Sequence, residues 1–217
     1  MIDRKILFLA PALFVAGAAF AQDGPLLDYR DQAFLIGSPF YSQAERQIVA
    51  AALADSEAGR ELGEDFAILG DAEGAFAVAE ADERIYLVQE SAPVAIDPIP
   101  EGAAPVLLVM QGDAAAEILT LPEDVQYQRL VAAADGNGDG RHEVLIESTF
   151  TNMGQSVTAL DVVALSDDGK ARPVETLQDV HVDACGNPSG EHRVSASVIS
   201  VGEDGFTAEA HESDCPR

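Results

Sequence analysis

Hydrophobic and polar residues alternate in short runs over most of the chain after residue 65. Two runs, 76–80 and 193–198, alternate with a period of two, which places apolar side chains on one face of a β-strand. The run Val106–Met110 is apolar throughout, which predicts a central strand buried on both faces. The runs that we expect as strands are Phe66–Leu69, Ala75–Ala81, Ile85–Glu90, Val106–Gln111, Glu117–Leu121, Leu130–Ala134, Val144–Phe150, Thr158–Ser166, Ala171–Leu177, Val180–Cys185, Arg193–Val201 and Phe206–His211.

Gly- and Asp-rich segments separate these runs, as hairpin turns require. The turns that we expect are Gly70–Gly74, Asp167–Lys170 and Gly202–Gly205. Short strands at regular spacing are typical of an all-β body. We therefore expect a mainly-β fold: an antiparallel meander, a partial propeller or a small sandwich.

One segment near the start of the chain has helical spacing instead. Ser42 and Glu45 form a capping box, and apolar residues follow at helical intervals up to Leu53. We predict one N-terminal α-helix over about 42–58, packed on the sheet. The segment 91–105 contains four prolines, which remove strand hydrogen-bond donors, so we expect a loop inside a single domain that covers 22–217.

The first residues have the form of a targeting segment. A short basic start, Met1–Lys5, is followed by the apolar run Ile6–Phe20 and the small-x-small triplet Ala19–Ala21. This pattern predicts a secretory signal peptide over 1–21, cleaved after Ala21, and a periplasmic or extracellular protein. No other run reaches the 18 or more apolar residues of a membrane helix, so we expect no membrane span after cleavage.

The charge balance excludes some partners. The chain has 38 acidic and 12 basic residues, which gives a formal net charge of −26. A nucleic-acid binder needs Lys and Arg to neutralise phosphates, so we expect no nucleic-acid partner. The two cysteines, Cys185 and Cys215, both lie in the exported part, where an even pair predicts a disulfide.

One loop carries recognisable chemistry. Asp135, Asn137, Asp139 and Glu143 place oxygen side chains at positions 1, 3, 5 and 9 of a Gly-rich segment. Calcium is a hard cation that prefers six to eight oxygen ligands, and the backbone carbonyl of Arg141 adds a further candidate. The pattern predicts a structural calcium site over 135–143; magnesium, or an acidic turn that binds no ion tightly, are the alternatives.

The flanks of this loop distinguish two known loop types. An EF-hand needs a helix on each side and an acid at position 12, where this chain has Ile146. Here strands are expected on both sides, and Val144–Ile146 follows the acid at position 9 directly. The loop resembles the FG-GAP/VCBS repeat of β-propeller proteins, whose loop binds calcium and braces neighbouring strands. The resemblance implies the same structural role here, in one loop only, because too few strands are expected for a propeller of four or more blades.

The weaker patterns give no definite site. His181, Asp183 and Cys185 share one strand face, with His192 and His211 nearby, but a disulfide and exposed histidines explain them better than a metal site. The aromatic residues Tyr29, Phe34, Phe40 and Tyr41 indicate core packing or a partner-binding edge.

We therefore expect an exported, non-catalytic binding or accessory protein with a structural calcium ion and an unidentified protein or polymer partner. No nucleophile motif indicates an enzyme. The alternative is a secreted hydrolase that acts on an extracellular polymer and uses calcium as a scaffold ion.

Overall fold

The computed structural model describes residues 24–37, 39–93, 102–123, 125–166, 170–188, 190, 192–202 and 204–216; the expected signal peptide lies outside them. In chain order the elements are β1 (Leu27–Asp28), α1 (Gln32–Ile36), α2 (Gln43–Leu53), α3 (Glu57–Leu62), β2 (Ala67–Gly74), β3 (Glu83–Gln89), β4 (Val106–Gln111), β5 (Ala114–Thr120), β6 (Arg129–Ala134), β7 (Glu143–Asn152), β8 (Gln155–Ser166), β9 (Lys170–Asp183), β10 (Arg193–Gly202) and β11 (Gly205–Asp214).

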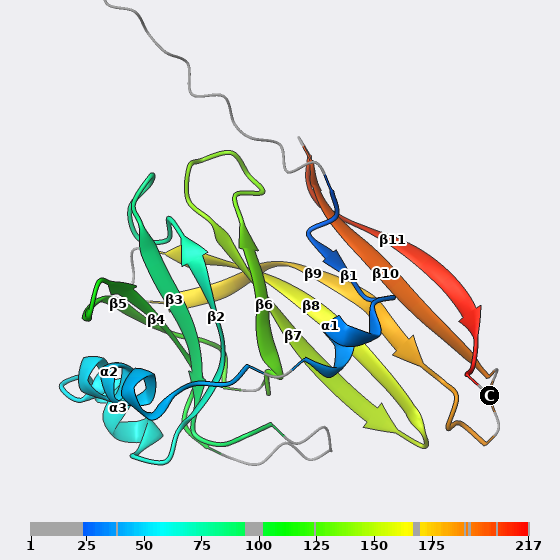
Figure 1. Cartoon of the computed structure of the whole chain (residues 1–217), viewed down its shortest axis with the longest axis horizontal. Helices are drawn as coiled ribbons and strands as arrows, with labels where there is room; N and C mark the ends of the chain where they lie inside the picture. Colours follow the sequence, from blue (N-terminus) through cyan, green and yellow to red (C-terminus); the bar gives the residue numbers. More distant parts are fainter. Residues whose placement is uncertain are drawn as a thin grey trace, which may run out of the picture.

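The strands form one mixed sheet that nearly closes into a barrel (Figure 1). Eight of them follow the order β2-β3-β4-β5-β9-β8-β7-β6, and β2 lies against β6 at the two ends of this path. The mainly-β prediction is thus confirmed. The pairing is not antiparallel throughout, because the end of β5 runs parallel to the start of β9 at Thr120 and Lys170.

Close approach of β2 and β6 depends on a glycine. At Gly70 the backbone φ is +141°, and an added Cβ would lie 2.4 Å from the carbonyl oxygen of Leu130. The register of β2 against β3 shifts between Ile68 and Asp71, so a bulge bends β2 at this point. Residues 70–74, which we expected as a turn, therefore continue β2 after the bend.

Two apolar cores share strand β4. Leu107 and Val109 face the barrel interior, whereas Val106, Leu108 and Met110 pack under the helices outside. All five are at most 2% exposed, which confirms the predicted central strand. The alternation of side chains along a strand sends successive residues into the two cores.

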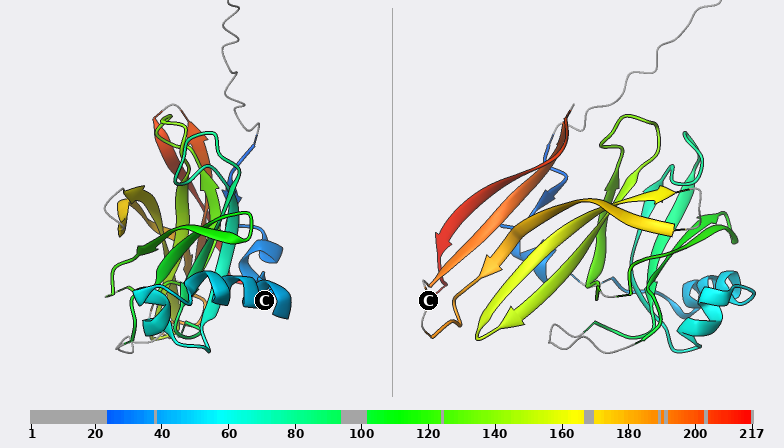
Figure 2. Two further views of the ribbon diagram at one scale, coloured as in Figure 1. Left: turned by 90° about the vertical axis from the view of Figure 1, so that its left-hand side faces the viewer. Right: turned by 180° about the vertical axis from the view of Figure 1, so that it is seen from behind.

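The predicted N-terminal helix is present but is divided in two. The Ser42 hydroxyl accepts a hydrogen bond from the amide of Glu45 and begins α2, as expected. The Ser56 side chain caps the amide of Gly59, so the chain starts a second helix, α3, inside the predicted range. Both helices cover the outside of β3 and β4, and Figure 2 shows them at one end of the molecule.

A third core lies on the outer face of β7 and β8. There Leu145 and Leu160 pack with Tyr29 and Ile199, which come from the N-terminal segment and from β10. Strand β10 pairs with the C-terminal part of β9, with β1 and with β11, so the last hairpin extends the sheet beyond the barrel (Figure 1).

Several expected boundaries were wrong. The run 75–81 forms a turn rather than a strand. The two runs expected over 171–185 form one strand, β9, with a left-handed residue at Asp179 (φ 55°) where the register against β8 shifts. Of the proline-rich segment, residues 91–93 and 102–105 lie outside helices and strands, as expected, and 94–101 lie outside the described residues.

The expected aromatic cluster does not form as one unit. Tyr29 is 1% exposed and packs edge-on against Phe34, with ring centroids 5.2 Å apart. Tyr41 instead contacts Tyr86, and Phe40 is 91% exposed. None of the helices in the described part of the chain has the length and hydropathy that crossing a membrane would take.

Candidate functional site

The predicted cation loop joins two strands, as expected. Residues 135–142 connect β6 to β7, and Glu143 is the first residue of β7. Gly138 and Gly140 have φ values of 76° and 86°, a region that glycine enters without steric cost and that lets the loop turn sharply. The strand–loop–strand context excludes an EF-hand, which needs flanking helices.

The side chains of this loop fold back onto its own backbone. The two carboxylate oxygens of Asp135 accept hydrogen bonds from the amides of Gly138 and Gly140, at 2.7 and 2.9 Å. Asn137 accepts from the amide of Asp139. Asp139 in turn accepts from the amide of Arg141. These bonds satisfy backbone donors that a tight turn leaves unpaired.

Glu143 is the buried member of the group. It is 5% exposed, and its carboxylate accepts hydrogen bonds from the amide of Gly136 and the side-chain amide of Asn137. Burial raises the pKa of Glu143; the hydrogen bond from Gly136 opposes this, and the charges of Asp139 and Asp135 raise the pKa further. The hydrogen bonds to Glu143 therefore do not fully offset the cost of burying its negative charge.

The oxygen donors of the loop are those that a hard cation prefers, but its acidic side chains do not lie together. Within the described residues, no three acidic, histidine or cysteine side chains lie close enough together to hold a metal ion. Of the predicted ligands, the structure brings Asn137 and Glu143 into direct contact. A carboxylate oxygen that accepts one N–H keeps a free lone pair, so the side chains of Asp135 and Asp139 retain capacity for a cation.

The loop connects two other parts of the molecule. The backbone amide of His142 donates to the carbonyl of Ala75, and its ring Nδ1 accepts from the amide of Ala75 at 3.1 Å. On its other side Gly136 lies under the ring of Phe206 in β11, where an added Cβ would be 2.2 Å from a ring carbon. The loop therefore packs between the β2–β3 turn and the last hairpin.

We expect Gly136→Ala to lower the free energy of unfolding by about 1–3 kcal/mol, because the new methyl group overlaps the ring of Phe206. Urea unfolding measures the change. Adding Phe206→Leu to Gly136→Ala should recover part of the lost free energy of unfolding. Gly202→Ala is the control, since an added Cβ there meets nothing within 4 Å. A Gly136→Ala protein as stable as the wild type would contradict the close packing of the loop.

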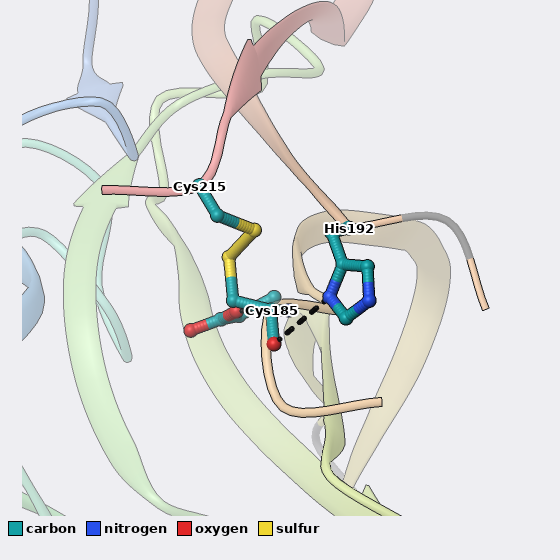
Figure 3. Close-up of a disulfide and its surroundings, with 4 residues drawn as sticks. Cys185, His192 and Cys215 are labelled. Carbon is teal, nitrogen blue, oxygen red and sulfur yellow. Dashed lines mark hydrogen bonds between the residues drawn. A yellow bond between two sulfur atoms is a disulfide. The ribbon is translucent and has the colours of Figure 1, made fainter. Parts of the chain in front are cut away.

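The predicted disulfide is confirmed. Cys185 and Cys215 are bonded, and their Cα atoms are 5.6 Å apart. In Figure 3 the ring of His192 lies beside the bridge, with Nδ1 3.2 Å from the carbonyl oxygen of Cys185. The bridge ties the end of β11 to the connection between β9 and β10, and it leaves Cys185 without a thiol for metal binding.

A second site, which the sequence reasoning missed, lies at the other end of β6. A cavity of about 560 Å³ lies between the N-terminal segment and strands β6 to β9. Glu147, 4% exposed, is at its edge; the Tyr29 hydroxyl donates to Oε1 at 2.8 Å and Arg129 Nε donates to Oε2 at 2.5 Å. The same guanidinium donates to the carbonyls of Phe34 and Gly37, which ties the N-terminal segment to the barrel.

Polar side chains from three neighbouring strands continue this cavity. Thr149, Thr158 and His181 face one another across β7, β8 and β9. Burial lowers the pKa of His181, although the charges of Asp183 and Glu147 act in the opposite direction. The strand-face pattern of His181 and Asp183 was visible in the sequence; the partners across the sheet were not.

Comparisons of the chain with protein-family models, with curated proteins and with solved structures find no match.

Proposed function

We propose that this chain is an exported, non-catalytic binding or accessory protein whose β6–β7 loop is a structural calcium site. The observation that carries the proposal is the position of the loop: it packs against Ala75 on one side and Phe206 on the other. An ion there would hold the β2–β3 turn and the last hairpin in fixed positions, through one loop rich in oxygen donors. The partner that such a surface serves is an unidentified protein or polymer.

The residues that would hold the ion are Asp135, Asn137, Asp139 and Glu143, with the backbone carbonyl of Arg141. Their oxygen-only donor set matches the preference of calcium, and the glycines of the loop allow the side chains to rearrange around an ion. The ion would neutralise the mutual repulsion of the carboxylates, which adds to the effect of burial in raising the pKa of Glu143.

Export is supported by the disulfide. Bridges of this kind persist in the periplasm and outside cells, and are rare in a reducing cytosol. The expected signal peptide over 1–21 agrees with such a compartment.

The alternative function is a hydrolase, and the cavity at Glu147 favours it because enzymes place polar groups in such cavities. The hydrogen bonds among the described residues of the cavity do not form the chain of nucleophile, base and acid that a hydrolase needs. A nucleophile must bond to its base, and the base to an orienting acid. Here the Ser156 hydroxyl bonds to Thr151, and the Asp183 carboxylate accepts from the amide of Cys185.

Calcium should raise the melting temperature of the mature protein by roughly 5–10 °C over EDTA, because a ligand at about 100 times its Kd stabilises the native state by mass action. The variant Asp139→Asn keeps an oxygen acceptor for the amide of Arg141 but removes a charge, and it should lose most of this difference. Differential scanning calorimetry measures both.

Asp113→Asn is the matched control, because this exposed residue lies in the β4–β5 turn, away from the loop. It should keep the full calcium response. Magnesium in place of calcium tests the choice of cation. Coincident melting curves of the wild type in calcium and in EDTA would refute the structural ion.

A further inference from the structure

The cavity at the start of β6 has an apolar side and a polar side. Its apolar side is formed by Leu35 and Pro39 of the N-terminal segment and by Ile68 of β2. Its polar side is formed by the outer face of β6 to β9. A volume of about 560 Å³ lies within the roughly 300–1,000 Å³ typical of small-molecule sites.

One residue that lines this cavity, Gln128, carries a hydrogen-bond donor without a partner among the described residues. The side-chain nitrogen Nε2 of Gln128 is buried and makes no hydrogen bond within the described part of the chain. Its backbone is held in place, since the amide of Gln128 donates to the carbonyl of Glu147 at 2.7 Å. A buried donor without a partner costs about 1–3 kcal/mol, so an acceptor that reached it would be bound favourably.

Two charged groups of the cavity, Arg129 and Glu147, are paired with each other, and the third, the carboxylate of Asp183, accepts a hydrogen bond from the amide of Cys185. Arg129 is engaged by Glu147 and by two carbonyl oxygens, so its guanidinium is not free to bind an anion. The negative charge of Glu147 is compensated by Arg129 in turn. The paired charges argue against a phosphate or carboxylate ligand, which would need an uncompensated cation.

The remaining groups both donate and accept hydrogen bonds. The hydroxyls of Thr149 and Thr158 lie 3.1 Å apart, and each can serve as donor or acceptor. The imidazole of His181 in its neutral form offers one nitrogen of each kind, and the carboxylate of Asp183 accepts. A ligand that satisfies Gln128 and Asp183 together must itself carry both acceptors and donors.

We propose that this cavity binds a neutral, hydroxyl-rich small molecule of the size of a mono- or disaccharide. Each hydroxyl of such a ligand is both donor and acceptor, and its C–H faces match the apolar side at Leu35 and Ile68. The inference deepens the proposed binding role by naming a ligand class. It does not depend on the calcium loop, which lies at the other end of β6.

The test is a saccharide panel applied to the disulfide-bonded mature protein: glucose, galactose, N-acetylglucosamine, sucrose and maltose, with putrescine and succinate as charged probes. Saturation-transfer NMR detects contact, and thermal melting reports stabilisation. At about 10 mM saccharide and a Kd near 1 mM, mass action raises the melting temperature by roughly 3–6 °C.

The variant Gln128→Leu removes the unpartnered donor and should weaken saccharide binding by about two- to tenfold, the usual effect of one lost hydrogen bond. Thr158→Val, which removes one hydroxyl with little change of volume, should also weaken it. Gln178→Leu is the matched control, because Gln178 is an exposed residue of β9 outside the cavity, and it should bind like the wild type.

The inference is overturned if none of the saccharides binds, if putrescine or succinate binds more tightly than every saccharide, or if Gln128→Leu and Thr158→Val both bind like the wild type. Saccharide binding with no response to calcium would retain this inference and remove the structural ion. A calcium response without saccharide binding would retain the structural ion and overturn this inference.

Discussion

Glu147→Ala lowers the free energy of unfolding by about 3–5 kcal/mol, the largest effect that we expect from one substitution. The change leaves the guanidinium of Arg129, 16% exposed at its side chain, without its carboxylate, and it removes the acceptor of the buried Tyr29 hydroxyl. An uncompensated buried charge is far more costly than an absent ion pair. Urea unfolding, followed by circular dichroism, measures the loss.

Replacing Tyr29, Arg129 and Glu147 together distinguishes the cost of an unpaired guanidinium from the net stability that the Arg129–Glu147 ion pair contributes. The triple variant Tyr29→Phe, Arg129→Met, Glu147→Leu should regain part of the lost stability, since apolar residues of similar volume replace a buried pair at little cost, whereas the carbonyls of Phe34 and Gly37 lose their donor. The exposed pair of Arg193 and Glu212 is the control, and Glu212→Ala should cost at most about 1 kcal/mol. If Glu147→Ala cost no more than Glu212→Ala, the network would not be what holds the N-terminal segment.

The double variant Cys185→Ser, Cys215→Ser should lose roughly 3–4 kcal/mol of stability. The bridge closes a loop with a sequence separation of 30, and opening it restores conformational entropy to the unfolded chain. In the described residues β11 pairs with β10 alone, so the end of β11 has no other strand to hold it. Hydrogen exchange should therefore accelerate first near Asp214, where β11 pairs with the start of β10 at Arg193.

The wild-type protein after reduction of its disulfide should unfold at the same urea concentration as this double variant, which controls for the serine side chains themselves. Strand β7, whose Leu145 and Ile146 are fully buried, should keep its exchange protection in both. A variant with unchanged stability and unchanged exchange near Asp214 would show that the bridge is redundant.

Features that depend on near neighbours in the chain were predictable from the sequence. The Ser42 cap of α2, the two-residue period of the strands and the Asp–Gly chemistry of the 135–143 loop involve residues a few positions apart. The disulfide was predictable for another reason: two cysteines allow one pairing within the chain. The division of the predicted helix at Ser56 was missed because a second cap, inside a helical pattern, stops a helix as effectively as a glycine.

Only the tertiary structure determined the cavity and its network. Tyr29 and Glu147 are 118 positions apart, and Arg129 reaches the carbonyl of Phe34 across 95 positions. Whether Arg129 faces Glu147 depends on the register of β6 against β7, and a slip of one residue would turn each side chain to the other face. The parallel contact of β5 with β9 and the glycine-dependent approach of β2 to β6 likewise follow from how the sheet curls. Local patterns determine which segments become strands; the packing of distant segments determines which side chains meet.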